Sequence, residues 1–424
     1  MASWPIGCAA VLAILLGSTA ANTATVGVAA EPGRLAAAIA AAATGDRLLL
    51  AAGRHVGPIV VDRALMLEGE PGAILDGGGV GHVVTVDAPQ VVLRGLTVTG
   101  SGSDLAAEDS GIFVSARAVG AMIEDNRLQG NLIGVNLKGP KAAIVRRNQI
   151  EGRHDRQMSE RGNGVSIWNS PGSVVEDNVI TYGRDGIFVI TSRNNVLRNN
   201  RFRELRFAVH YMYADKGNVS GNASAGNHVG YALMYSAGLT VEGNRSEGDR
   251  DHGMLLNYTN GARIEGNAVV MGGEKCVFIY NSTKNIFRGN WFEGCQIGIH
   301  LTAGSERNAI SGNAFIGNRT QVKYVGTRYQ EWSDAGRGNF WSDNPAFDLN
   351  GDGVADQPYR PNDLIDQVVW RHPLAKLLLN SPAVQTVRFT QARFPALLPG
   401  GLVDSAPLMA PPLVPAATTA EPAG

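Results

Sequence analysis

The sequence has almost no net charge, few cysteines and only one long apolar run. Its 37 Lys and Arg residues nearly balance 38 Asp and Glu residues, for a formal net charge of −1. Nucleic-acid partners are usually bound by a basic face, so this balance argues against them. Beyond the first 21 residues, no stretch is long and apolar enough to span a bilayer. Glycine is abundant, with 53 residues, and the 44% hydrophobic content suffices for a large core.

The N-terminal region indicates an export signal. Residues 5–21 form an apolar run followed by small residues, which is typical of a secretory signal peptide cleaved between Ala20 and Ala30. The run is too short and too rich in alanine for a stable membrane span. No Lys or Arg precedes it, which departs from the usual signal, and Cys8 lacks the lipobox of a lipoprotein. We expect a signal peptide over residues 1–30 and an exported mature chain.

Two ladders of residues recur in phase along the middle of the chain. Asparagines return every 22 or 23 residues, apart from one interval of 30 that contains an insertion at residues 153–161. The asparagine ladder consists of Asn126, Asn148, Asn178, Asn200, Asn222, Asn244, Asn267, Asn290 and Asn313. The second ladder is mostly glycine and consists of Gly111, Gly134, Gly164, Gly186, Ala208, Gly230, Gly253, Cys276, Gly298 and Gln321. Self-similarity at a fixed period is the signature of a solenoid.

Apolar residues keep fixed positions relative to both ladders. An apolar residue lies three positions before each asparagine, as Val175 lies before Asn178. After the glycine ladder, side chains alternate with period two, as in Ile187-Phe188-Val189, in segments too short for helices. Stacked coils of this kind form parallel sheets, with coils spaced roughly 4.8 Å apart. The sequence therefore predicts an all-β, single-stranded, right-handed parallel β-helix with coils of 22–23 residues, whose asparagines stack inward.

The repeat is bounded on both sides. Residues 31–330 are assigned to the β-helix, with a short helix expected over residues 34–43 that covers the open end of the core. Residues 331–398 form a C-terminal segment with an acidic loop and apolar stretches suited to partner docking. The tail over residues 399–424 is rich in Pro and Ala and is predicted to be disordered.

Three C-terminal motifs carry a family resemblance. They are GNFWSD at residues 338–343, DLNGDGVADQPYRPND at residues 348–363 and WRHPLAKLLLNSPAVQ at residues 370–385. With the Gly-Asn coils, over roughly residues 31–410, the chain resembles the NosD family of nitrous oxide reductase maturation proteins. The resemblance implies a periplasmic, non-enzymatic β-helix that docks on an ABC transporter made of a membrane permease and a cytoplasmic ATPase. It also implies cooperation with a copper-carrying lipoprotein in assembling the copper centres of nitrous oxide reductase, and membrane association through the permease only.

A candidate copper site lies on the outward side of the alternating strand. His210 and Met212 are two residues apart and share that side, and Met234 lies one coil beyond Met212, roughly 5 Å away in backbone spacing. Imidazole and thioether ligands suit the soft ion Cu(I). The sequence predicts a transient Cu(I) site from these three residues, with His300 as a weaker candidate.

The same surface also fits a docking patch for a partner protein. Tyr213, Tyr235 and Tyr258 are expected to stack on successive coils beside the methionines. Aromatic residues and Met are enriched in interface cores, and the sequence favours docking over direct copper ligation at this surface.

A second candidate metal site has the spacing of a calcium loop. Asp348, Asn350, Asp352 and Asp356 occupy positions 1, 3, 5 and 9, but position 12 is Tyr359 where a bidentate Glu is expected. A structural Ca²⁺ ion and an Asx-rich turn both remain open.

Residues 364–385 carry an apolar stripe that includes Trp370, Leu374, Leu377 and Leu378, interspersed with basic residues. The stripe fits either docking on the transporter permease or a cap on the β-helix core. The family resemblance favours docking.

A turn cluster and an insertion are two further features of the sequence. The turn cluster resembles an acid–base constellation, but we expect solvated ion pairs. It consists of Arg184, Asp185, Arg206, His228, Asp251, His252, Glu274 and Lys275. The insertion, with His154 and Met158, should stand out from its coil and could contact a partner.

Cys276 and Cys295 fall on adjacent coils, about three positions out of line in the repeat. An oxidising compartment permits a disulfide, whereas this offset disfavours one. Both states remain open.

The main alternative function is a polysaccharide lyase, hydrolase or uronate epimerase, because many parallel β-helices process acidic sugars. Such sites need acids, arginines or calcium aligned on the exposed strand, which here is mostly neutral, aromatic and thioether. A third class, a surface adhesin or carbohydrate-binding module, predicts oligosaccharide binding and no transporter partner. The fold alone does not decide among these.

Overall fold

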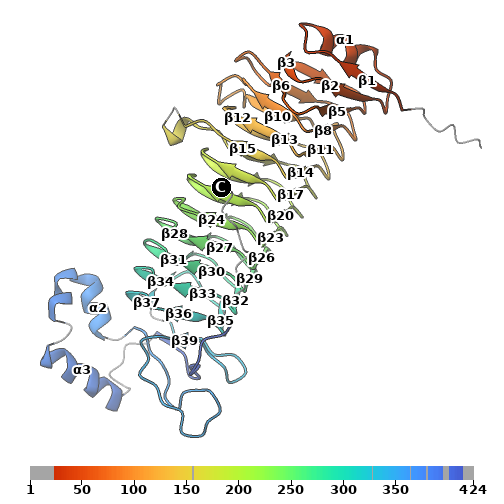
Figure 1. Ribbon diagram of the computed structural model, residues 1–424. Helices are drawn as coiled ribbons and strands as arrows, with labels where there is room; N and C mark the ends of the chain where they lie inside the picture. Colours follow the sequence, from red (N-terminus) through yellow and green to blue (C-terminus); the bar gives the residue numbers. More distant parts are fainter. Residues whose placement is uncertain are drawn as a thin grey trace, which may run out of the picture.

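The chain winds into one elongated coil whose N-terminal end is covered by a helix and whose C-terminal end carries a helical extension (Figure 1). The computed structural model describes residues 23–154, 157–326, 328–362, 364–378, 381–394 and 401–413. Within these residues, three long parallel sheets run along the coil, and each complete turn contributes one strand to each sheet. The predicted parallel β-helix is confirmed.

Sheet 1 has 13 strands among the described residues. They are β1 (Thr25–Val28), β2 (Arg47–Leu50), β5 (Met66–Gly69), β8 (Val92–Arg94), β11 (Met122–Glu124), β14 (Ile144–Arg146), β17 (Val174–Glu176), β20 (Val196–Arg198), β23 (Asn218–Ser220), β26 (Thr240–Glu242), β29 (Arg263–Glu265), β32 (Ile286–Arg288) and β35 (Ala309–Ser311). Because β1 pairs in register with β2, the β-helix begins before residue 31, the predicted boundary. Residues 1–22, with Cys8 and most of the expected signal peptide, lie outside the described residues.

Sheet 2 has 12 strands in the described chain and carries the candidate copper site. They are β4 (Ile59–Val61), β7 (Val84–Val86), β10 (Ser110–Val114), β13 (Ile133–Lys138), β16 (Val165–Trp168), β19 (Asp185–Ile190), β22 (Phe207–Met212), β25 (Val229–Met234), β28 (His252–Asn257), β31 (Lys275–Tyr280), β34 (Ile297–Thr302) and β37 (Thr320–Val325). Most of these strands have five or six residues, so each presents two or three side chains outward.

Sheet 3 has 13 strands within the same ranges. They are β3 (Gly53–Val56), β6 (Ala73–Asp76), β9 (Thr97–Thr99), β12 (Arg127–Gln129), β15 (Gln149–Glu151), β18 (Val179–Thr181), β21 (Arg201–Arg203), β24 (Ala223–Ala225), β27 (Arg245–Glu247), β30 (Ala268–Val270), β33 (Trp291–Glu293), β36 (Ala314–Ile316) and β39 (Phe340–Trp341).

The asparagine ladder stacks inside the corner between sheets 1 and 3, as the sequence predicts. The Oδ1 atom of Asn148 accepts hydrogen bonds from the backbone N (3.0 Å) and the Nδ2 atom (3.1 Å) of Asn126 in the previous turn. This pattern continues to Asn313, and a further member, Asn339, follows it. Each amide therefore satisfies a corner backbone group that would otherwise be buried without a partner.

The C-terminal tail closes this ladder, which corrects the prediction of disorder from residue 399. The backbone N of Asn339 donates to Asp404 Oδ2 at 2.7 Å. Strand β40 (Leu402–Val403) pairs with β38 (Gln330–Glu331), and Asp404 is fully buried. The composition of the tail, rich in Pro and Ala, predicted disorder, but a short apolar segment at Leu402 and Val403 completes the core. Residues 414–424 lie outside the described residues.

Both ends of the core are covered. Helix α1 (Arg34–Ala41) buries Leu35 and Ile39 at the N-terminal end, as predicted. At the other end Trp341 stacks between Phe315 (4.4 Å between ring centroids) and Tyr359 (4.6 Å). These rings and the tail cover the C-terminal end of the core. The helices that follow lie beside the coil; they are α2 (Leu364–Arg371), η2 (Pro373–Leu378) and α3 (Pro382–Arg393) (Figure 1).

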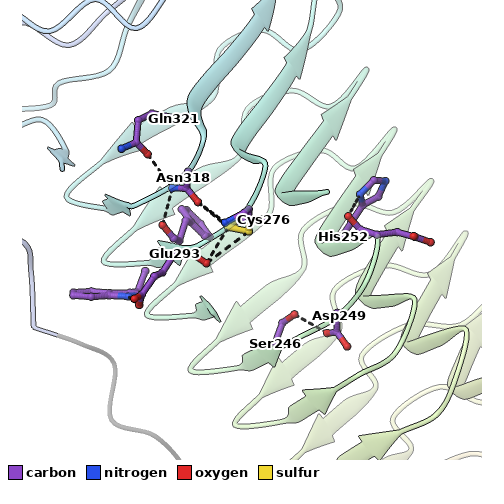
Figure 2. The surroundings of a disulfide bond; sticks show 11 residues. Ser246, Asp249, His252, Cys276, Glu293, Asn318 and Gln321 are labelled. Atoms are coloured by element: carbon purple, nitrogen blue, oxygen red, sulfur yellow. Dashed lines mark hydrogen bonds between the residues drawn. A yellow bond between two sulfur atoms is a disulfide. The ribbon is translucent and has the colours of Figure 1, made fainter. Parts of the chain in front are cut away.

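Cys276 and Cys295 form a disulfide bond with a Cα–Cα distance of 5.6 Å. Figure 2 shows its surroundings, where Asn318 Oδ1 accepts from the backbone N of Cys295 at 2.9 Å. The expectation that their offset disfavours a bond was wrong. Cys276 lies inside β31, whereas Cys295 lies in the bend before β34, so the bend brings the two cysteines within bonding range.

Candidate functional site

The outer face of sheet 2 brings the three predicted copper ligands together. Met212 pairs directly with Met234 on the next turn, and His210 lies two residues before Met212 on β22. Val209 and Tyr211, which alternate with these side chains, are fully buried in the core. The imidazole and both thioethers therefore lie on the outward side of adjacent strands, as the periodicity predicts.

His210 is more enclosed than an outward position suggests. Its ring lies 4.7 Å from the Phe188 ring and 5.0 Å from the Phe207 ring, and the residue is only 6% exposed. The repeat register did not indicate this, because Phe207 is the first residue of β22 and its ring closes over His210 from the strand end. Met212 and Met234 are half-buried.

A buried carboxylate holds the imidazole in place. His210 Nδ1 lies 2.9 Å from Asp185 Oδ2. Arg206 donates to both oxygens of Asp185, from Nε at 2.8 Å and from Nη2 at 2.7 Å. Burial alone would raise the pKa of Asp185, but the hydrogen bonds from His210 and Arg206 outweigh it and lower that pKa. Asp185 is fully buried, so the expectation of a solvated turn was wrong at this residue.

The rest of the turn cluster matches that expectation in part, since Asp251 is exposed whereas Lys275 is buried. His228 Nδ1 lies 3.3 Å from Asp251 Oδ2 on an exposed turn. Lys275 Nζ pairs with Glu274 Oε1 at 2.6 Å. These pairs lie on later turns than Asp185 and do not extend its hydrogen-bonded group.

A stack of tyrosines borders the methionines. The ring centroids of Tyr213 and Tyr235 are 4.9 Å apart, and those of Tyr235 and Tyr258 are 5.1 Å apart. All three side chains are exposed. Tyr280, which the repeat did not single out for docking, extends the row at 6.0 Å from Tyr258. The structure therefore forms the predicted aromatic row next to Met212 and Met234.

His300 belongs to a different group. Strand β34 is four steps along sheet 2 from β22, so His300 lies far from His210. Its ring stacks on Phe278 at 4.9 Å. Burial, and then the charges of Lys323 and Lys275, lower the pKa of His300 to about 4. The structure does not bring His300 to the candidate copper site.

A small cavity lies at the N-terminal end of the aromatic face. It has a volume of about 180 Å³ and is lined by Trp168 and Phe188 on the apolar side and by Glu108, Asn163 and Arg184 on the polar side. The methionines do not line it.

The acidic loop holds itself together through its own backbone. Asp348 accepts from the backbone N atoms of Gly351 (2.7 Å) and Gly353 (2.8 Å). Asn350 Oδ1 accepts from Asp352 N at 3.0 Å, and Asp356 Oδ2 accepts from Leu349 N at 2.8 Å. These are the contacts of the Asx-turn alternative. Among the described residues, no group of three or more His, Cys, Asp or Glu side chains is placed to hold a metal ion.

The predicted docking leucines lie on η2 and face away from the coil's core. Leu374, Leu377 and Leu378 are 82%, 86% and 60% exposed. Trp370 lies in α2, but its side chain is outside the described residues. Within the described part of the chain, no helix is long and apolar enough to cross a membrane.

The insertion forms a short excursion from its coil. The ring of His154 lies 4.7 Å from the Tyr182 ring, and its Nε2 lies 3.4 Å from Glu151 Oε1. Met158 begins the one-turn helix η1 (Met158–Glu160). Residues 155 and 156 lie outside the described residues.

Fold and surface together define the class: a parallel β-helix protein with an outward histidine, thioether and aromatic face on one sheet. Residues 146–346 match the family described as "Periplasmic copper-binding protein (NosD)". A "Probable ABC transporter binding protein NosD" from Stutzerimonas stutzeri is 41% identical over 86% of this chain and 87% of its own length. One of the same name from Pseudomonas aeruginosa is 43% identical, over 87% of this chain and 90% of its own length. The chain belongs to the NosD family.

A solved structure shares the architecture. The A-module of the mannuronan C-5 epimerase AlgE6 from Azotobacter vinelandii matches with a TM-score of 0.57 over 69% of this chain and 90% of its own. The two sequences are 16% identical, so the likeness is one of fold.

Proposed function

We propose that this protein is an exported, non-enzymatic accessory protein for assembly of the copper centres of nitrous oxide reductase. It acts in the periplasm as a subunit of an ABC-transporter complex, cooperates with a copper-carrying lipoprotein, and receives or passes on Cu(I). The family description as copper-binding and the relatives' names as transporter binding proteins support this proposal.

The observation that carries the proposal is the direct pairing of Met212 with Met234 beside His210. Two thioethers and one imidazole form a soft, neutral ligand set, which suits Cu(I) better than hard divalent ions. His210 is buried, whereas Met212 and Met234 are half-buried, so a donor or acceptor protein would supply the next ligand from the side of the methionines. Such a site fits a transient cargo.

Two surfaces serve partners in this proposal. The row of Tyr213, Tyr235 and Tyr258 borders the methionines with exposed aromatic rings, as expected where a copper donor or acceptor docks. The exposed leucines of η2 dock on the permease, because they lie beside the coil and the core is already covered by Trp341 and the tail.

Cu(I) binding tests the site. The wild-type protein should take Cu(I) from a chromophoric chelator such as bicinchoninate under reducing, anaerobic conditions. Met212→Leu/Met234→Leu should lose that binding and remain folded, because the change conserves volume. Met271→Leu is the matched control, since Met271 is an exposed methionine on another coil. Equal binding by the double variant would remove the site.

Co-purification tests the transporter contact. Leu374→Asp/Leu377→Asp should stay folded and lose the detergent-solubilised permease, whereas Leu413→Asp, at another exposed leucine, should retain it. A chain cut after residue 363 is unsuitable, because it also lacks the Asp404 that closes the ladder. Unfolding of the Leu374→Asp/Leu377→Asp variant would support a capping role for η2.

The enzyme alternative has a separate test. A lyase or epimerase would act on uronate polymers, seen as unsaturated products or as changed C-5 stereochemistry. We expect neither with purified protein, with or without added calcium.

A further inference from the structure

We infer that Asp185, held by Arg206, is a positioning residue that fixes the tautomer of His210 and reserves its Nε2 atom for Cu(I). This inference rests on the proposed copper function of His210. It adds two residues to that function, neither of which touches the metal.

The hydrogen-bond geometry determines which ring nitrogen carries the proton. Asp185 accepts two bonds from Arg206, on Oδ1 at 2.8 Å and on Oδ2 at 2.7 Å, so its carboxylate is ionised and can only accept. His210 Nδ1 lies 2.9 Å from Asp185 Oδ2 and must therefore donate. In the neutral ring the lone pair then resides on Nε2. Metal-binding histidines commonly have this arrangement, in which one ring nitrogen binds the metal and the other donates to a carboxylate.

The Nε2 atom itself lacks a protein partner. It is buried and makes no hydrogen bond to any described residue. A buried polar atom without a partner is unfavourable, so the folded chain retains an acceptor that a soft metal ion would satisfy. Phe188 and Phe207 flank the ring and limit its freedom to rotate away from Asp185.

The coil itself does not require a carboxylate at this position. In register with Asp185, the following turns carry Phe207 and then Val229. In register with His210, the neighbouring turns carry Phe188 and Ala232. These turns form the same strands with apolar side chains, so the fold of these neighbouring turns does not require the buried Asp185–His210 pair. This local departure is at the proposed copper site.

Asp185→Asn tests the inference against a merely structural role. The variant keeps the shape of the side chain but faces Arg206 with an amide, so the fixed orientation of His210 is lost. We expect the Cu(I) affinity to fall about 10- to 100-fold, as for other groups that orient metal-binding histidines. Glu176→Gln is the matched control, because Glu176 is also a buried carboxylate paired with an arginine, Arg198, but lies on sheet 1. Its Cu(I) affinity should not change.

Nitrogen NMR of the wild-type protein reports which ring nitrogen of His210 carries the proton, and a change in stability does not alter this signal. With ¹⁵N-labelled histidine and assignment by His210→Gln, the neutral metal-free ring should be the Nδ1–H tautomer. Diamagnetic Ag(I), used as a probe for Cu(I), should shift Nε2. An Nε2–H tautomer, or a metal shift on Nδ1, would overturn the inference even if Asp185→Asn does not fold.

The outcomes separate the two proposals. If the wild-type protein binds neither Cu(I) nor Ag(I), the proposed copper function fails and the positioning role falls with it. If the wild-type protein binds Cu(I) and folded Asp185→Asn binds it equally tightly, only the positioning role is refuted.

Discussion

Replacing Asp404 should destabilise the C-terminal end of the coil. The Oδ2 atom of Asp404 accepts from Asn339 N at 2.7 Å and from Trp341 Nε1 at 2.8 Å, and Oδ1 accepts from Ala406 N at 3.2 Å. Asp404→Ala leaves these donors without that acceptor. Each buried, unsatisfied donor costs about 1–3 kcal/mol.

Part of this cost is offset. Burial raises the pKa of Asp404, against the opposing hydrogen bonds from Asn339 and Trp341, so the buried charge itself is unfavourable. Removing this charge therefore offsets part of the stability lost with the hydrogen bonds. We therefore expect a net loss of about 3 kcal/mol in the free energy of unfolding for Asp404→Ala.

The assay should resolve where the coil opens. Trp332 and Trp341 are buried in the cap, so their fluorescence reports this end during urea unfolding. A loss of about 3 kcal/mol corresponds to a midpoint lower by about 1 M urea for a slope of about 3 kcal/mol/M. Hydrogen exchange should increase first in β39 and β36, since each turn of a solenoid contacts mainly its neighbours.

The isosteric Asp404→Asn variant is the control. Its amide oxygen can still accept from Asn339 and Trp341, so we expect a change of about 1 kcal/mol or less. If Asp404→Ala unfolded at the wild-type midpoint with unchanged exchange in β39, the tail would not be the closing element of the ladder, and the reasoning would be refuted.

Three other perturbations test separate parts of the chain. Because the pKa of His300 falls from 6.5 to about 4 on folding, the unfolded state binds the proton first, so stability should fall as pH drops from about 6.5 to 4. Allowing for partial exposure, the loss should be about 1–2 kcal/mol, and His300→Gln should flatten the pH profile of thermal melting; an unchanged slope would contradict the shift. Cys276→Ser/Cys295→Ser should lower the free energy of unfolding by about 3 kcal/mol relative to the oxidised wild type, given the 19-residue separation of the cysteines. Urea unfolding measures this change, and the reduced wild type should unfold at the same midpoint as the variant. Calcium should raise the melting temperature and bind in equilibrium dialysis if Asp348, Asn350, Asp352 and Asp356 hold the ion, and Asp352→Ala should abolish both effects; no binding would establish the Asx-turn alternative.

The periodic parts of the molecule were predictable because one repeat encodes them many times. A 22- or 23-residue interval between asparagines fixes the length of a turn, and the alternation around Phe188 fixes which side chains face outward. Together they predict that Met212 lies opposite Met234, as the structure shows.

The features that the repeat did not predict lie where the period breaks. Asn339 follows Asn313 after 26 residues, and Asp404 follows Asn339 after 65, so neither continues the interval that identifies the ladder. The Cys276–Cys295 bond depends on a bend before β34. The burial of His210 depends on Phe207 and Asp185 at strand ends, which short-period patterns do not describe.

The backbone conformation at the tyrosine row supports a role beyond folding. The residue after each of these sheet 2 strands is left-handed, with φ of 52° at Tyr213, 49° at Tyr235 and 51° at Tyr258. Equivalent bends elsewhere carry Asn169, Thr191 and Asn281, and asparagine tolerates this region better than a bulky aromatic residue does. Ring stacking recovers some of the strain, since aromatic pairs contribute about 0.5–1.5 kcal/mol. The fold alone would be served as well by asparagine, so the exposed rings fit the partner docking that we propose beside Met212 and Met234.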